Sequence, residues 1–165
     1  IQLWVNLPRY KKMSAPRCQT ILKAQIPTIE IAEGAGRLRV IAGACQGYKG
    51  PARTVTPIEL YDLELVAGGC AEVLLPDGHT ASLFVMRGLV SANGSNDAGE
   101  AELIVCERGG SSVVIEAREG SLLLILSGQP IREPIARYGP FVMNTKIELV
   151  QALEDYKAGK MGHLS

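Results

Sequence analysis

Short apolar runs follow one another along most of the chain, and turn-forming residues separate them. Between residues 24 and 133 the apolar positions show no helical periodicity. Short strands at this spacing, bounded by glycine, proline and asparagine, are typical of an all-β sandwich or barrel. The expected strands span residues 25–30, 38–42, 58–66, 71–75, 82–90, 102–106, 112–116 and 121–126.

The first residues show strand alternation of their own. Leu3, Val5 and Leu7 fall on one side of residues 2–7, with polar or amphipathic side chains between them. This alternation predicts a strand, which Pro8 ends because proline cannot continue a hydrogen-bonded ladder.

The last thirty residues carry the one helical pattern. Thr145 and Glu148 have the spacing of a capping box, in which each side chain bonds the backbone N–H of the other residue. The helix is therefore expected over residues 145–158, with Gly159 as its stop. The packing face is expected to comprise Ile147, Val150 and Leu153, with Leu149 and Tyr156 at its margins and with Glu154 and Asp155 in water.

Length and charge narrow the class of protein. The chain has 165 residues, enough for one domain with a real core, and its 47% hydrophobic content argues against disorder. Seventeen basic residues balance seventeen acidic ones, so nucleic-acid binding through excess positive charge is not expected. No apolar stretch is long enough to span a membrane. Because the first residue is Ile1 rather than Met, we expect a chain cut from something longer.

The four cysteines suggest an intracellular protein. Cys18, Cys45, Cys70 and Cys106 are dispersed and form no CxxC pair. We expect reduced, mostly buried thiols, since a chain of this length needs no disulfide frame. No histidine lies near any of them in the sequence, so a thiol nucleophile has little support.

Histidines and carboxylates offer little recognisable chemistry. His79 is interpreted as an ordinary turn residue, and His163 as part of a solvated tail. Two dispersed histidines do not readily supply a transition-metal site. Glu59, Asp62 and Glu64 could provide a general acid and base, but their spacing selects no pair, and a solvated strand face is expected.

Three segments have a more specific composition. They are residues 2–19, residues 50–62, and the motifs G-x-P-x-x-E-P and G-P-F-V-M-N-T within residues 127–145. In this order they resemble the later half of the pirins, a family of bicupin proteins. The residues that carry the resemblance, taken as structural, are Trp4, Asn6, Pro57, Asp62, Gly128, Pro130, Glu133, Pro134, Gly139, Pro140, Phe141, Asn144 and Thr145.

The resemblance implies a fold and a division of the chain. The fold is all-β, a cupin-type double-stranded β-helix barrel with a C-terminal α-helix. Residues 1–20 would be the end of a preceding cupin barrel plus a connector. Residues 21–134 would be the C-terminal barrel, and residues 135–165 a turn, helix and tail that pack on it.

The resemblance also implies a metal in the other half of the protein. Pirins hold iron in the N-terminal barrel through three histidines and a glutamate, whereas the C-terminal barrel usually lacks a metal. A cupin metal motif anchored on Gly88 places Leu75 and Asp77 at histidine positions and Ala81 at the glutamate position, with His79 out of register. We therefore expect no cofactor in this chain and iron in the N-terminal barrel of a full-length relative.

Three functions follow as hypotheses. The first is a scaffold or interaction module of an iron-binding transcriptional or metabolic co-regulator. The second is part of a quercetin (flavonol) 2,3-dioxygenase whose metal site lies in the preceding barrel, so that this chain alone is not expected to be an enzyme. The third is a small-ligand binding barrel without catalysis.

Expected partners are the N-terminal cupin barrel and, by resemblance, transcription factors or metabolic enzymes, but neither nucleic acid nor a membrane. The expected location is intracellular: cytoplasmic, and nuclear in a eukaryote.

Overall fold

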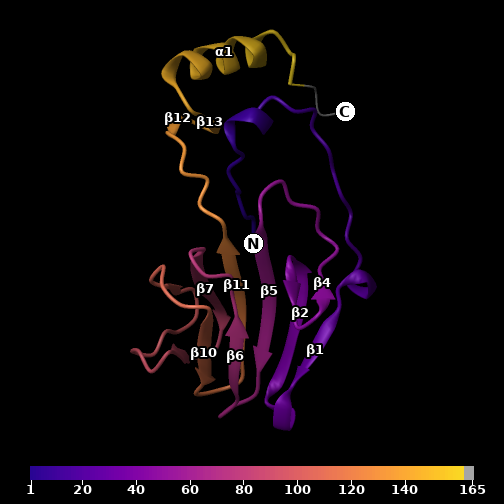
Figure 1. The fold of residues 1–165 in the computed structure, drawn as a ribbon, viewed down its shortest axis with the longest axis vertical. Helices are drawn as coiled ribbons and strands as arrows, with labels where there is room; N and C mark the ends of the chain where they lie inside the picture. Colours follow the sequence, from indigo (N-terminus) through magenta and orange to yellow (C-terminus); the bar gives the residue numbers. More distant parts are fainter. Residues whose placement is uncertain (162–165) are drawn as a thin grey trace. The chain divides into compact units, whose positions relative to one another are not determined.

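The computed structural model describes residues 1–161, which form two compact units (Figure 1). Residues 17–130 make up one unit, and residues 1–16 join the residues from 131 onward in the other. His163 lies outside the described residues. No helix within residues 1–161 is both long and apolar enough to cross a membrane.

A six-stranded antiparallel sheet dominates the unit of residues 17–130. Its strand order is β1-β2-β5-β11-β7-β9. The strands span Thr28–Ile31 (β1), Gly36–Ala42 (β2), Ile58–Leu65 (β5), Thr80–Arg87 (β7), Leu103–Val105 (β9) and Ser121–Gly128 (β11). Each corresponds to a predicted apolar run.

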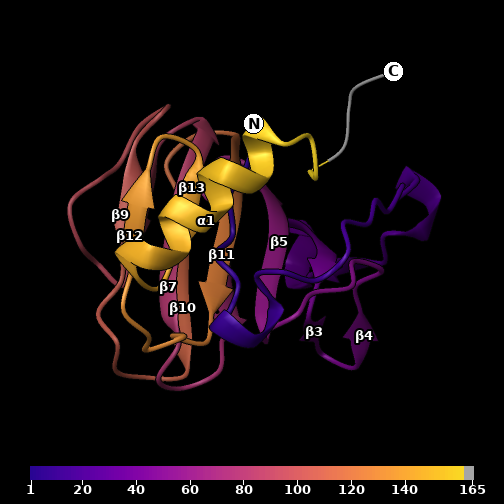
Figure 2. The ribbon, with the colours of Figure 1, turned by 90° about the horizontal axis from the view of Figure 1, so that it is seen from above.

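A second sheet has three strands in the order β6-β10-β8. They span Cys70–Leu74 (β6), Val90–Ala92 (β8) and Ser112–Ala117 (β10). The sequence pattern merged β8 with β7, but Gly88 separates them at a φ of +91°. A short hairpin of Ala44–Cys45 (β3) and Tyr48–Lys49 (β4), which the pattern did not predict, contacts β2 through β4 (Figure 2).

The two sheets pack face to face because each presents one apolar face. Strand β11 alternates strictly between buried and half-buried residues, and Leu123 and Ile125 are completely buried. Val73 and Ile115 of the small sheet join them in one core. This is the two-residue period expected of strands. The predicted all-β sandwich is confirmed. Among the described strands the edges β8 and β9 do not pair, so the sandwich does not close into a barrel.

The other unit contains the helix and a small hairpin. Strands Ala136–Tyr138 (β12) and Phe141–Met143 (β13) pair, and helix Lys146–Lys157 (α1) lies across them (Figures 1 and 2). The 3-10 turn Arg9–Lys11 belongs to this unit, and the 3-10 turns Lys23–Gln25 and Ala32–Gly34 belong to the sandwich unit.

The predicted capping box of the helix is confirmed. Thr145 Oγ1 accepts a hydrogen bond from the backbone N–H of Glu148 at 3.2 Å, and a Glu148 carboxylate oxygen accepts one from the N–H of Thr145 at 2.8 Å. These bonds satisfy two N–H groups that a helix start otherwise leaves unpaired. Gly159 follows the helix with a φ of +71°, as expected of a C-terminal stop.

The predicted packing face of the helix is wrong. Leu149, Ala152 and Asp155 are buried, whereas Ile147 is 83% exposed. Asp155 was expected in water, but its carboxylate accepts hydrogen bonds from Gln151 and Lys160, at 3.0 and 2.8 Å. Since the helix has apolar residues on several sides, tertiary contacts rather than periodicity select the buried face.

The predicted strand at residues 2–7 is also wrong. These residues adopt no strand, and Leu3, Trp4 and Val5 are exposed. Alternation alone does not make a strand, because the backbone needs a neighbouring strand to satisfy its hydrogen bonds. No strand within residues 1–161 pairs with this segment.

Candidate functional site

Register places three polar or small residues together at one end of the large sheet. Ser127 of β11 lies opposite Glu59 of β5 on one side and opposite Ala81 of β7 on the other. Their side chains share the inner face of the sheet, since all three residues are buried. The expectation that Glu59 lies on a solvated strand face is therefore wrong. The buried Tyr61 and Leu63 follow it at two-residue intervals on the same face.

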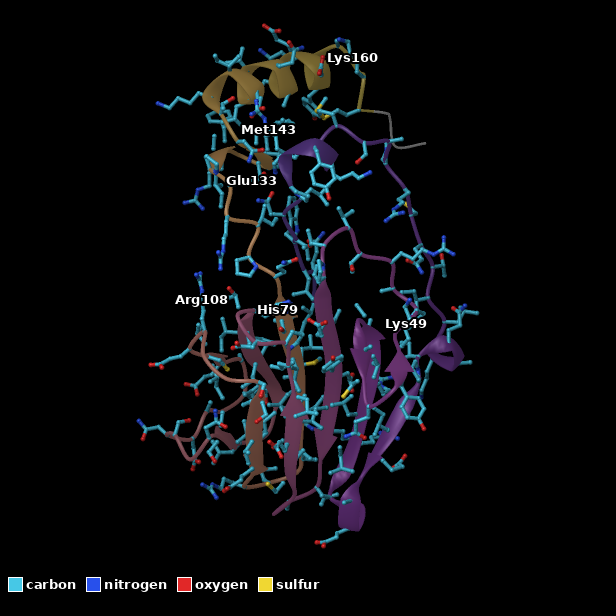
Figure 3. All side chains as sticks on the ribbon, viewed as in Figure 1. Lys49, His79, Arg108, Glu133, Met143 and Lys160 are labelled. Atoms are coloured by element: carbon cyan, nitrogen blue, oxygen red, sulfur yellow. The ribbon has the colours of Figure 1, made fainter. Side chains whose placement is uncertain are left out.

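His79 completes this cluster from the turn before β7 (Figure 3). Its Nδ1 lies 3.1 Å from Glu59 Oε2 and 3.2 Å from Ser127 Oγ, and the imidazole is only 9% exposed. His79 is thus not the ordinary turn residue that the sequence suggested. The sequence did not indicate this cluster, because strand register brings its residues together. Glu59 and His79 are 20 positions apart along the chain, and His79 and Ser127 are 48 positions apart.

The geometry of the cluster does not match a serine nucleophile triad. In a triad the hydroxyl and the carboxylate contact opposite ring nitrogens of the histidine. Here both approach the same atom, Nδ1. The arrangement instead fixes the orientation of the imidazole, and its other nitrogen, Nε2, makes no hydrogen bond to any of residues 1–161.

A cavity of about 410 Å³ adjoins His79. It lies between the unpaired edges of the sandwich, at the ends of β6, β8 and β9 and the start of β10. The side chains of Leu75, Ala81 and Ile104 contribute apolar walls, and Asn93 and Cys106 contribute polar ones. Glu59 and Ser127 do not line it.

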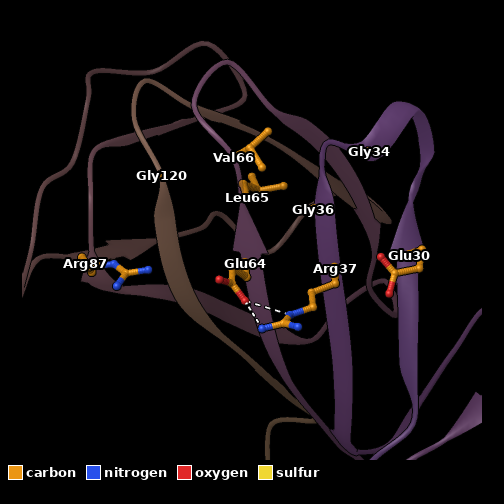
Figure 4. Close-up of a pocket in the computed structure, with 9 residues that line it drawn as sticks. All are labelled: Glu30, Gly34, Gly36, Arg37, Glu64, Leu65, Val66, Arg87 and Gly120. Carbon is orange, nitrogen blue, oxygen red and sulfur yellow. Dashed lines mark hydrogen bonds and ion pairs between the residues drawn. The ribbon is translucent and has the colours of Figure 1, made fainter.

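The two other predicted carboxylates lie on the outer face. Asp62 is buried under an ion pair with Arg39, which also raises the pKa of that guanidinium, so the expectation of a solvated Asp62 is wrong. Glu64 Oε2 forms an ion pair with Arg37 Nη2 at 2.6 Å. Arg87 lines a surface pocket together with Arg37 and Glu64 (Figure 4). These are cross-strand charge pairs, which carry no acid–base chemistry by themselves.

The motif residues near the helix form one hydrogen-bonded network. Asn144 Nδ2 donates to Glu133 Oε2 and to the carbonyl of Pro134, each at 2.9 Å. Glu133 Oε2 also accepts from the backbone N–H of Arg9 at 2.8 Å, and the Arg9 guanidinium donates to Glu148. Through Glu133 and Glu148, this network ties Arg9 to the start of the helix.

The remaining motif residues have separate positions. Gly139, at a φ of +52°, and Pro140 form the β12–β13 turn. Phe141 is half-buried and packs edge-on against Tyr156 with ring centroids 5.8 Å apart. Asn6 accepts a hydrogen bond from Lys12, whereas Trp4 is 71% exposed. In the other unit, the carbonyl of Pro57 accepts from Gln129, and Gly128 ends β11 two residues before Pro130.

Comparison with known proteins identifies this arrangement. Residues 60–162 match the family model described as the pirin C-terminal cupin domain. The chain belongs to the pirin family. Its sandwich is the cupin fold: a solved structure described as quercetin 2,3-dioxygenase from Acinetobacter baumannii superposes with a TM-score of 0.93 at 40% identity, covering 98% of this chain and 56% of that one.

Curated relatives agree with this pirin assignment. A Pseudomonas aeruginosa protein named "Putative quercetin 2,3-dioxygenase" is 43% identical over 97% of this chain and 56% of its own length. A pirin-like protein of Solanum lycopersicum is 36% identical over 98% of this chain and 56% of its length. The chain therefore spans somewhat more than half the length of these pirins.

The cupin metal positions of this pirin domain do not suit a metal. Leu75 is buried, with no donor atom; Ala81 is buried and equally inert; and Asp77 is exposed in the turn before β7. Within residues 1–161, no three histidine, cysteine or acidic side chains gather as a metal site would require. The iron that the resemblance implies for pirins does not fit these residues.

The four cysteines of this pirin domain are expected to differ in the reactivity of their thiols. All are free; Cys18 and Cys70 are exposed, Cys45 is buried and Cys106 is half-buried, so the expectation of mostly buried thiols is wrong in part. Burial raises the pKa of the Cys45 and Cys106 thiols, which lowers their thiolate fraction. We expect a disulfide reagent to modify Cys18 and Cys70 first, as measured by peptide mass spectrometry. Equal rates for all four in the folded protein would contradict the burial of Cys45.

Proposed function

We propose that this domain is a scaffold and interaction module of a longer, iron-binding pirin that regulates transcription or metabolism. The observation that supports the proposal most is the filling of the sandwich interior. Tyr61, Leu63, Leu83, Val85, Ile115, Leu123 and Ile125 are almost completely buried there. A redox reaction on a flavonol needs a metal to activate oxygen or the substrate, and the residues at the motif positions offer no suitable donors.

The second unit supplies the surface for this role. Its large apolar side chains are mostly exposed, and among the hydrophobic residues that the structure describes there only Leu149 and Ala152 are buried. Contiguous exposed apolar patches mark interaction sites, and we propose that these side chains form one. The exposed set comprises Ile1, Leu3, Trp4, Val5, Tyr10, Met13, Ile135, Tyr138, Ile147, Val150, Tyr156 and Met161. We propose the metal-bearing cupin half of a full-length pirin as its main partner, with transcription factors or metabolic enzymes as further partners of the whole protein.

A second candidate function rests on the relatives. The Pseudomonas aeruginosa relative at 43% identity is named "Putative quercetin 2,3-dioxygenase", and the Acinetobacter baumannii structure at 40% identity is described as quercetin 2,3-dioxygenase. In that case this domain would be the non-metal half of a dioxygenase, and catalysis would depend on a preceding cupin half.

Metal content and flavonol turnover test the scaffold proposal. The 165-residue chain is dialysed against a mild chelator, analysed for metals by mass spectrometry, and incubated aerobically with quercetin and added Fe²⁺. We expect no stoichiometric metal and no loss of quercetin absorbance. A full-length pirin relative, treated in parallel, is the positive control for the assay.

The outcomes separate the hypotheses. Turnover by the 165-residue chain would overturn the scaffold proposal, as would one tightly held metal ion per chain. Turnover that appears only when the chain is joined to a metal-bearing cupin half would favour the dioxygenase function over the regulatory one.

A further inference from the structure

We propose that the cavity beside His79 is a binding site for a compact, mainly apolar molecule that carries one N–H or O–H donor, and that His79 Nε2 accepts the hydrogen bond from this donor. This goes beyond the scaffold function and does not depend on it. The proposal rests on the cavity's position, on the orientation of His79 and on the side chains that surround both.

The orientation of the imidazole follows from its neighbours. Nδ1 faces the Glu59 carboxylate, which can only accept hydrogen bonds when ionised, so the ring proton of a neutral His79 belongs on Nδ1. Nε2 then carries the lone pair. A carboxylate behind the opposite nitrogen makes the free nitrogen a better acceptor, as it does for metal-bound histidines.

The proposal places the free nitrogen on the cavity side of the ring. The two ring nitrogens point away from each other, and the partners of Nδ1, Glu59 and Ser127, lie outside the cavity wall, whereas His79 is part of it. Within residues 1–161 Nε2 makes no hydrogen bond, and it is not among the fully buried polar atoms without a partner. It is therefore an acceptor that a molecule in the cavity can reach.

The walls define the rest of the ligand. Leu75, Ala81, Ile104 and Val113 are apolar, and a volume of about 410 Å³ lies at the small end of the range for ligand pockets. Asn93 Oδ1 is already engaged by the N–H of Val114 at 2.8 Å, so it does not compete as an acceptor. Ser95, Glu107 and Ser112 also line the cavity, so polar groups interrupt its apolar walls. The apolar part suits a fused-ring or similarly compact molecule whose donor faces His79.

The cavity also follows from the fold. In a closed barrel β8 and β9 would be neighbours, but here each is a short edge strand of three residues. The small side chains Ala81 and Ala92 face the opening and leave room that larger residues would fill. Substitution at Ala92 therefore offers a direct way to block the site.

Indole and 1-methylindole are the probes that test the proposal, because methylation removes the only donor and little else. Each is titrated into the 165-residue chain at about pH 8, where an ordinary imidazole is neutral, and binding is followed by amide and imidazole ¹⁵N spectra. We expect saturable indole binding, shifts centred on Ile104, Cys106 and Val113, a shift of the His79 Nε2 resonance, and 1-methylindole affinity lower by about three- to tenfold.

A matched pair of variants completes the experiment. Ala92→Leu fills the cavity and is expected to weaken indole binding at least tenfold. Ala67→Leu makes the same change at an exposed position that does not line the cavity, and should leave binding unchanged. Since Ala92→Leu could disturb folding, its amide spectrum is compared with that of the parent chain, and the comparison of the two probes does not depend on it.

Three results would overturn the proposal. One is equal affinity for indole and 1-methylindole, which would show that Nε2 accepts no hydrogen bond. Another is a set of shifts confined to residues outside the cavity, such as those along α1. The third is the absence of saturable indole binding up to its solubility limit.

Discussion

Replacing Gly36 by alanine is expected to lower the free energy of unfolding by about 4 kcal/mol. Gly36 begins β2 with a φ of +153°, in a region that side chains rarely adopt. A Cβ there would lie 2.0 Å from the carbonyl oxygen of Glu64 and 2.9 Å from Leu65 Cα (Figure 4). These are backbone atoms of β5, so no rotation of a side chain can relieve the clash.

The expected loss of unfolding free energy in Gly36→Ala combines two effects. Strained backbone conformations cost about 1–3 kcal/mol each, and overpacking costs about 1–3 kcal/mol. The β2–β5 ladder must shift, although its register carries the core residues Leu38 and Leu63. Urea unfolding followed by far-UV circular dichroism measures the loss, because the single tryptophan, Trp4, lies in the other unit and would not report on the sheet.

Gly34→Ala is the matched control. Gly34 also has a positive φ, +71°, but a Cβ would meet no atom within 4 Å. Only the left-handed backbone penalty of about 1–2 kcal/mol is expected there. If the two variants lose the same stability, the close approach of β2 to β5 does not explain the glycine at position 36.

Replacing His79 by leucine is expected to cost about 1–3 kcal/mol of folding free energy, the penalty for leaving a buried polar group without its neighbour. His79 and Glu59 have side chains only 9% and 12% exposed. Glu59 Oε2 accepts no well-formed hydrogen bond in the described structure, so the nearby imidazole is its main polar neighbour. Without it a carboxylate remains buried and uncompensated, which is more costly than the loss of a contact.

A double variant distinguishes the cost of the unpartnered Glu59 carboxylate from the cost of lost packing. Adding Glu59→Leu to His79→Leu removes the stranded carboxylate and should recover more than half of the lost stability in chemical unfolding. Ser127→Ala removes the other neighbour of Nδ1 but strands no charge, so about 1 kcal/mol is expected. A double variant less stable than His79→Leu would show that the cluster stabilises the fold through packing instead.

The sequence predicted local structure best where the physical cause is local. Turn residues and alternating apolar side chains located the strands of the six- and three-stranded sheets except β8, and the capping box located the start of α1 to within one residue. The prediction failed where the cause was distant. Residues 2–7 alternate like a strand but find no partner within the described chain, and the buried face of α1 depends on β13.

The candidate site could not be predicted from the sequence, because its residues are distant along the chain. Glu59, His79 and Ser127 belong to three separate apolar runs or turns, and each alone has an unremarkable setting. Strand register brings Glu59 and Ser127 directly opposite each other, and the β6–β7 turn then places His79 over both. The Leu75, Asp77 and Ala81 substitutions in the cupin metal motif, in contrast, are visible from residue identity.

By itself, the sequence determined the all-β class, the pirin relationship and the lack of donor atoms at two of the three cupin metal positions, Leu75 and Ala81, because these depend on residue types and on neighbours close along the chain. The tertiary structure alone decided that Glu59 and Asp62 are buried, that His79 is held by Nδ1, and that a cavity opens between β8 and β9. Those features arise from the register of strands far apart in sequence and from which sheet edges stay unpaired, and no local pattern encodes either.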